Sequence, residues 1–297
     1  MAYYYVFPKL TAASGTLLAP PVYQHFMASS INAEMFTAAL MLLGMPDITM
    51  RLLPWLNCLP VLYAVYALLR EYGNDRRLAV LGVALVSGSS AFGYLGTMGK
   101  LDGMAIGQGA VALLCLYKAW GSGYRRFWLF LCGLMCGFAG SFKISYLVIL
   151  GPCVFFMSVG VLGIFSEARA WKTPFKTLAL GLAVVGLGTA LPMLVHFAKN
   201  WVMTGAFMEA LGSFAYFSPK TTLNLVLSYP LALVFGKYWE QNGHISTLLI
   251  SLIPLALLLP PKKWFIGKPL LILTVGVYSV LATWLVLFPS VFQPRYI

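Results

Sequence analysis

Long apolar runs separated by short polar segments dominate the pattern of this chain. Most runs approach about 20 residues, the length that an α-helix needs to cross the hydrocarbon core of a bilayer. A transmembrane β-barrel would instead show segments of about ten residues with alternating hydrophobicity. The pattern therefore predicts an all-α, polytopic membrane helix bundle of about eight spans. We place them at 50–70, 78–99, 102–120, 126–142, 144–165, 175–197, 245–260 and 269–289.

Three further segments have apolar residues at helical spacing but are too short to span a bilayer. They are 3–14, 31–44 and 222–236, and we expect them to be amphipathic helices at the membrane interface. The chain is then a single transmembrane domain, 1–297. It divides into an outer loop (1–49), six spans (50–197), a second outer loop (198–244), and two spans with a tail (245–297).

Small residues inside the apolar runs indicate close helix packing. Glycines four residues apart, at Gly103 and Gly107 and again at Gly133 and Gly137, let two helix backbones approach each other. The cysteines also lie inside apolar runs, without an accompanying histidine or acid, so we interpret them as small packing residues. They are Cys58, Cys115, Cys132, Cys136 and Cys153.

Composition and charge agree with lipid as the main solvent. The chain is 60% hydrophobic and only 9% charged, whereas soluble domains carry roughly 25% charged residues. The net charge of +12 comes largely from loops that alternate with loops poor in Lys and Arg. The positive-inside rule places these basic loops in the cytoplasm, which explains the charge without nucleic acid. Their basic residues are Arg70, Arg76, Arg77, Lys118, Arg125, Arg126, Arg169, Lys172, Lys176, Lys262, Lys263 and Lys268.

Ionisable residues at the opposite, outer ends of the spans are candidates for function, because charge near membrane depth is costly. They are Glu34, Lys100, Asp102, Lys143, Lys199 and Arg295, with His25 and His196 nearby. Lysines can bind the phosphate of a lipid donor as point charges, and a carboxylate can act as a base or hold a metal ion. Alternatively, the lysines extend to the headgroups, Asp102 caps the helix that it opens, and the histidines are satisfied interfacial side chains.

Short motifs in a fixed order resemble those of a known family. They are Tyr-Tyr-Tyr-Val-Phe-Pro-Lys-Leu at 3–10, Ala-Glu-Met-Phe at 33–36, Lys-Leu-Asp-Gly-Met at 100–104, Gly-Phe-Ala-Gly-Ser-Phe-Lys at 137–143, Lys-Asn-Trp-Val-Met-Thr-Gly at 199–205 and Arg-Tyr-Ile at 295–297. The order resembles that of the C-type (GT-C fold) polyprenyl-phosphate-dependent glycosyltransferases, in particular the protein-mannosyltransferase and aminoarabinose-transferase group. The resemblance covers nearly the whole chain.

The resemblance implies a site at the outer face of a bacterial inner (plasma) membrane. There, a sugar would pass from a polyprenyl-phosphate donor to a lipid, glycan or protein acceptor by inverting displacement. Asp102 and Glu34 are the candidate catalytic acids, and a divalent metal ion between them is an option. Lys143, with Lys100, Lys199 and Arg295, would bind the donor phosphate. In such enzymes a catalytic acid precedes the tyrosine-rich stretch, so we expect this chain to be a fragment, cut at both ends, that lacks the acid and the first span.

Two other classes of protein fit the apolar pattern. A transporter or lipid flippase would have spans but no chemistry, and such proteins usually show internal repeats and broken helices near the bilayer midplane. The sequence shows no convincing repeat, and its ionisable residues gather at the outer edge. A structural membrane subunit, whose outer charges only anchor it, is the third interpretation. We favour the glycosyltransferase.

Overall fold

The computed structural model describes residues 2–16, 32–71, 75–89, 92–93, 102–121, 125–159, 161–162 and 175–207, which are helices and short connections without any strand. The all-α prediction is thus confirmed for the described part of the chain. The predicted spans at 245–260 and 269–289, the interfacial segment 222–236, and the residues His25, Lys100 and Arg295 lie outside it.

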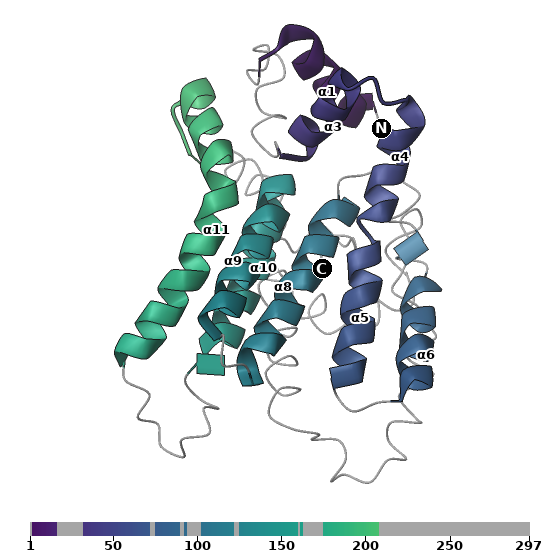
Figure 1. Ribbon diagram of the computed structural model, residues 1–297. Helices are drawn as coiled ribbons and strands as arrows, with labels where there is room; N and C mark the ends of the chain where they lie inside the picture. Colours follow the sequence, from purple (N-terminus) through teal and green to yellow (C-terminus); the bar gives the residue numbers. More distant parts are fainter. Residues whose placement is uncertain are drawn as a thin grey trace, which may run out of the picture.

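Two short helices form where the sequence predicts amphipathic segments. They are α1 (Ala2–Ser14) and α3 (Asn32–Leu42), and they pack against each other. A glycine with positive φ follows each of them, Gly15 at 64° and Gly44 at 73°. This left-handed conformation is typical of a helix C-terminus and favours glycine. Both helices lie across one end of the bundle (Figure 1).

The first predicted span is two helices rather than one. The chain forms α4 (Asp47–Leu56) and α5 (Leu59–Glu71), with a break at Asn57 and Cys58. The backbone N–H of Asn57 and its side-chain amide both donate to the Leu53 carbonyl, at 3.0 and 2.9 Å. A side chain that bonds to the preceding turn competes with regular helix hydrogen bonds. The prediction of one continuous helix over 50–70 was wrong because it gave no weight to Asn57 and to Pro60, which stands in the first turn of α5.

The remaining helices are α6 (Arg76–Ser87), α8 (Asp102–Gly121), α9 (Arg125–Phe142), α10 (Ile144–Val159) and α11 (Phe175–Thr204). Helix α9 is central, with α8 packed on one side and α11 on the other (Figure 1). Among the described residues, Lys176–Thr204 in α11 is the one helix whose length and apolarity, at a mean hydropathy of 2.2, suit a membrane crossing. Helix α11 also runs past the predicted end at 197.

Glycines allow α9 and α11 to approach closely, as their spacing predicts. A methyl group on Gly133 would overlap the carbonyl oxygen of Val185, and one on Gly137 would overlap that of Thr189. Gly107 of α8 meets the Asn57 carbonyl at the α4–α5 break in the same way. The five cysteines are buried free thiols, which confirms their interpretation as packing residues.

From α5 onward, helices that follow one another in the chain run in opposite directions, so each end of the bundle collects a distinct set of residues. We call the end that carries α1 and α3 the covered end; it also holds the starts of α8 and α10 and the ends of α9 and α11 (Figure 1). The opposite end, here the basic end, holds an ion pair between Lys118 and Glu71. It also exposes six further charged side chains to solvent: Arg70, Asp75, Arg76, Arg77, Arg126 and Lys176.

Candidate functional site

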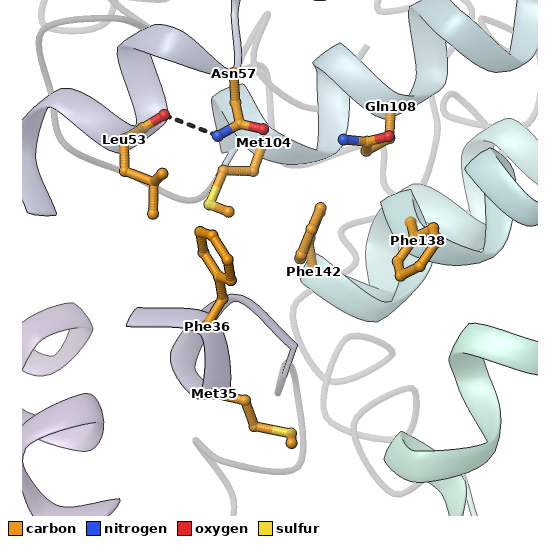
Figure 2. Close-up of a pocket in the computed structure, with 8 residues that line it drawn as sticks. All are labelled: Met35, Phe36, Leu53, Asn57, Met104, Gln108, Phe138 and Phe142. Atoms are coloured by element: carbon orange, nitrogen blue, oxygen red, sulfur yellow. Dashed lines mark hydrogen bonds between the residues drawn. The ribbon is translucent and has the colours of Figure 1, made fainter. Parts of the chain in front are cut away.

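A pocket of about 540 Å³ opens between α3 and the bundle at the covered end. Four helical segments meet around it: α3, the α4–α5 break, the first turns of α8 and the last turns of α9. Figure 2 shows Phe36 extending from α3 toward Leu53 and Met104 on the other side. The lining residues are Met35, Phe36, Leu53, Asn57, Met104, Gln108, Phe138 and Phe142.

The pocket lining is chemically uniform. Three phenylalanines, two methionines and a leucine supply most of its surface, and the amides of Asn57 and Gln108 supply the polar atoms. The Asn57 amide donates to the Leu53 carbonyl, so it already has a partner. Among the described residues that line the pocket, none carries a charge. Such a lining favours a hydrocarbon chain over a phosphate, because burying an unpaired charge is costly.

Two of the predicted site residues lie next to this lining in the chain. Asp102 is the first residue of α8, two residues before Met104. Lys143 directly follows Phe142 and forms the junction between α9 and α10. Its N–H donates to the Ala139 carbonyl at 3.1 Å, its carbonyl accepts from the Tyr146 N–H at 2.9 Å, and its side chain is half-buried. The fold therefore places the backbones of Asp102 and Lys143 at the covered end, within two residues in the chain of side chains that line the pocket.

A second group of polar residues is buried on α11, with Glu34 of α3 also buried. His196, Lys199 and Asn200 lie on one face of α11, because residues three and four apart are neighbours on a helix. Their exposed fractions are 1%, 5% and 0%, and that of Glu34 on α3 is 5%. The opposite charges of Glu34 and Lys199 act on each other. The other face of α11 carries large exposed apolar side chains, among them Leu194, Val195, Trp201 and Val202.

Asn200 ties the last turns of α11 together. Its Nδ2 lies 3.2 Å from Nε2 of His196 and 3.3 Å from the carbonyl oxygen of Phe207. A carbonyl oxygen only accepts hydrogen bonds, so the NH₂ group of Asn200 must face both partners. Nε2 of His196 then accepts, which assigns a neutral imidazole with its proton on Nδ1. The chain turns away at Gly205, whose φ is 72°.

Sequence reasoning identified the charged residues but missed their neutral neighbours. Asn57 and Gln108 lie in no motif, so a polar amide in an apolar run was the only signal available, and Asn200 lies in the motif at 199–205 but was given no role. A metal site is also not apparent: within the described ranges, no three His, Cys, Asp or Glu side chains gather into a metal-binding group. The charge of Lys199 acts on Glu34, and that positive charge would disfavour a cation at this carboxylate.

Comparison with known proteins bears on the whole arrangement. No curated protein and no solved structure matches the chain. The family described as dolichyl-phosphate-mannose-protein mannosyltransferase matches residues 13–205, which is more than half of the chain and runs from the end of α1 to the turn after α11. The predicted resemblance is confirmed: the chain belongs to this family of membrane glycosyltransferases with the GT-C fold, which use a polyprenyl-phosphate sugar donor.

Proposed function

We propose that the covered end is the active site, and that it transfers a mannose-like hexose from a polyprenyl phosphate to a protein or glycan acceptor. The bundle would have about eight spans by the length of its apolar runs, with the covered end facing outward across a bacterial plasma membrane. This orientation is supported by the positive-inside rule, because the opposite end carries the basic loops. The observation that carries the proposal is the uncharged pocket beside Asp102 and Lys143.

The pocket and the nearby charged residues would bind different parts of the donor. The apolar lining suits the first isoprene units of the donor, whose transfer from water is favourable. The phosphate then lies at the pocket mouth, where we assign Lys143 to it. Lys100 and Arg295 stay predicted phosphate ligands outside the described residues.

The chemistry is a single displacement at the anomeric carbon. The acceptor hydroxyl oxygen forms the new bond to this carbon, and the bond to the phosphate oxygen breaks, leaving the electron pair on the polyprenyl phosphate. Lys143 stabilises the charge that develops on the leaving phosphate. The hydroxyl proton passes to a carboxylate, and we assign Asp102 to orienting the acceptor. A divalent metal ion stays a prediction, and no step here depends on it.

The test uses the full chain in proteoliposomes with a polyprenyl-phosphate mannose donor. Loss of donor and labelling of an acceptor are measured for the wild type, for Lys143→Ala and for Lys118→Ala. Lys118 is the matched lysine at the basic end, so its replacement should leave turnover unchanged. Lys143→Ala should lower turnover by about a hundredfold, as losing one transition-state donor does elsewhere. Equal turnover in Lys143→Ala and the wild type would refute the phosphate role.

A transporter or flippase is the second candidate function. The same proteoliposomes discriminate between the two classes. A flippase would move labelled donor between leaflets without cleaving the bond between sugar and phosphate, whereas the glycosyltransferase consumes it.

A further inference from the structure

A second hollow, which we call the α10–α11 groove, lies between these two helices. It has a volume of about 470 Å³, and Cys136 of α9 also lines it. Phe138 and Phe142, which line the pocket at the covered end, are two and six positions after Cys136. On a helix with 3.6 residues per turn, these positions lie on the opposite face. Helix α9 therefore separates the α10–α11 groove from the candidate site.

Contacts between the two helix segments bound the groove at both ends. Toward the covered end, the buried side chains of Ile144 on α10 and Met193 on α11 pack together. Toward the basic end, Leu162, just beyond α10, packs so closely on Gly181 of α11 that a methyl group there would overlap it. The groove is the space that remains where α10 and α11 separate between these two contacts.

Two glycines line this space without serving helix contact. A methyl group on Gly151 of α10 or on Gly186 of α11 would meet no atom within 4 Å. By contrast, a methyl group on Gly133 or Gly137 of α9 would overlap the α11 backbone. Small residues in membrane helices usually let two backbones approach. In the α10–α11 groove they instead widen a gap.

The lining of the groove is apolar. Among the described residues that form it, the polar side-chain groups are the hydroxyl of Thr189 and the thiol of Cys136. The hydroxyl donates to the Val185 carbonyl on its own helix at 3.0 Å, so it already has a partner. A polar ligand would leave its own groups without hydrogen bonds there, which is costly. The lining therefore suits a hydrocarbon chain.

The dimensions of the groove fit one such chain and not a helix. Its lining on α11 runs from Leu182 to Phe197, a rise of roughly 22 Å. The volume spread over this length leaves a cross-section of roughly 20 Å², whereas a helix about 10 Å across would need roughly 80 Å². A slender chain can lie between α10 and α11, and a further helix cannot.

The groove opens onto a surface that faces lipid. Gly186 and Ala190 at its edge are exposed, and their neighbours Leu187 and Leu191 are exposed apolar side chains. These residues belong to the part of α11 whose length and apolarity suit a membrane crossing, in a chain of a membrane-enzyme family. The molecules at the opening are therefore lipids, whose acyl chains have the required chemistry.

We propose that the α10–α11 groove binds one acyl chain of a membrane phospholipid, which packs between the two helices as part of the folded protein. An empty groove would deprive its walls of van der Waals contacts, and the bilayer supplies acyl chains at the opening. A lipid that binds the native state stabilises it. The site is separate from the pocket for the sugar donor, so it does not depend on the proposed function.

The test uses the full chain in phosphatidylethanolamine vesicles. A minor fraction of the phosphatidylethanolamine carries a diazirine halfway along one acyl chain, and the residues labelled on irradiation are identified by mass spectrometry. Ala190→Leu fills the groove from α11, and Gly151→Leu fills it from α10. Ala183→Leu is the matched control, because Ala183 is also exposed on α11 but does not line the groove.

We expect label on Val154 and Val185 of the wild type, because both line the groove but are otherwise buried. Surrounding lipid should label Leu187 in every variant. Ala190→Leu and Gly151→Leu should lower the label on the two valines by about tenfold, the scale of overpacking a filled site, and Ala183→Leu should match the wild type. In lipid-depleted detergent, added phosphatidylethanolamine should raise the unfolding temperature of the wild type but not that of Ala190→Leu.

Three results would overturn the proposal. Label on Leu187 without label on Val154 and Val185 in the wild type would mean that another part of the chain fills the groove. Equal label on the valines in Ala190→Leu, Gly151→Leu and Ala183→Leu would mean that lipid reaches them by another route. Loss of the label on adding polyprenyl phosphate, but not on adding unlabelled phosphatidylethanolamine, would assign the groove to the tail of the sugar donor.

Discussion

Lys118 and Glu71 pair at the basic end with side chains that are 35% and 40% exposed, whereas Glu34 and Lys199 at the covered end are each 5% exposed. Lys118 and Glu71 form an ion pair, whereas Glu34 and Lys199 act on each other only through their charges. Water and salt screen the pair at the basic end, and such pairs contribute little to stability. Glu34 and Lys199 have little contact with water, so protein groups must stabilise their charges. Charged residues therefore mark the solvent-exposed end of the bundle at one place and belong to the candidate site at the other.

The largest effect should come from breaking the buried pair. Glu34→Gln removes a negative charge that acts on the buried Lys199 ammonium, so we expect a loss of about 3 kcal/mol in the free energy of unfolding. Glu71→Gln at the basic end should cost less than about 1 kcal/mol. Denaturant unfolding in detergent, with both variants at matched protein concentration, measures the difference. Equal losses would erase the distinction drawn between the two ends.

The next test compares two aspartates, Asp102 at the covered end and Asp75 at the basic end. Asp102→Asn should lower kcat by about a hundredfold, the scale of losing acceptor alignment. Asp75 precedes α6 at the basic end and is exposed. Asp75→Asn should therefore leave transfer at the wild-type rate. Sugar transfer by both variants is measured in proteoliposomes, and a comparable loss in Asp75→Asn would argue against placing the site at the covered end.

The glycines of α9 allow a test of the close packing between α9 and α11, the helices that connect the two ends of the bundle. Gly137→Ala would bring a methyl group into the Thr189 carbonyl and force α9 away from α11, at a cost of about 2 kcal/mol, typical of overpacking. Gly186→Ala on α11 is the control, because its added methyl group would meet no atom within 4 Å. The shift in unfolding temperature is the measurement. If the control falls as far as Gly137→Ala, helix propensity rather than close packing explains both.

The smallest effect concerns the pocket wall. Phe36→Leu keeps an apolar side chain facing the pocket, so we expect the donor KM to rise by less than about tenfold. Leu42 is on the same helix and 69% exposed, so Leu42→Ala should leave KM unchanged. A larger change for Leu42→Ala would place the donor on the outer side of α3 instead.

Sequence reasoning worked best where local chemistry marks a helix end. Glycines and basic residues bracket α8 and α9, and their predicted bounds agree closely with the structure. The same reasoning ended α11 at 197 because His196, Lys199 and Asn200 are polar. Those side chains face the protein interior, where each finds partners or an opposite charge, so the helix continues to Thr204.

The contacts of the candidate site were beyond prediction from one sequence. Glu34 and Lys199 are far apart in the chain, and nothing in either motif indicates that both are buried and that their charges interact. The α4–α5 break depends on the Asn57 amide bonding to Leu53, and its carbonyl fits against Gly107 of a distant helix. Such long-range packing is decided by the tertiary fold, not by the apolar pattern that identifies a span.

The length of α11 has a further consequence. Its 30 residues rise through roughly 45 Å at 1.5 Å per residue, while the hydrocarbon core of a bilayer is about 30 Å thick. A helix of this length that crosses without strong tilt must therefore extend beyond the hydrocarbon core. If the extra length of α11 lies at the covered end, the turn from His196 to Asn200 reaches the depth of the lipid headgroups. The end of α11 then supports α1, which Met203 contacts through Phe7. A lipid-linked sugar would then find its phosphate level with the cleft without being lifted out of its leaflet.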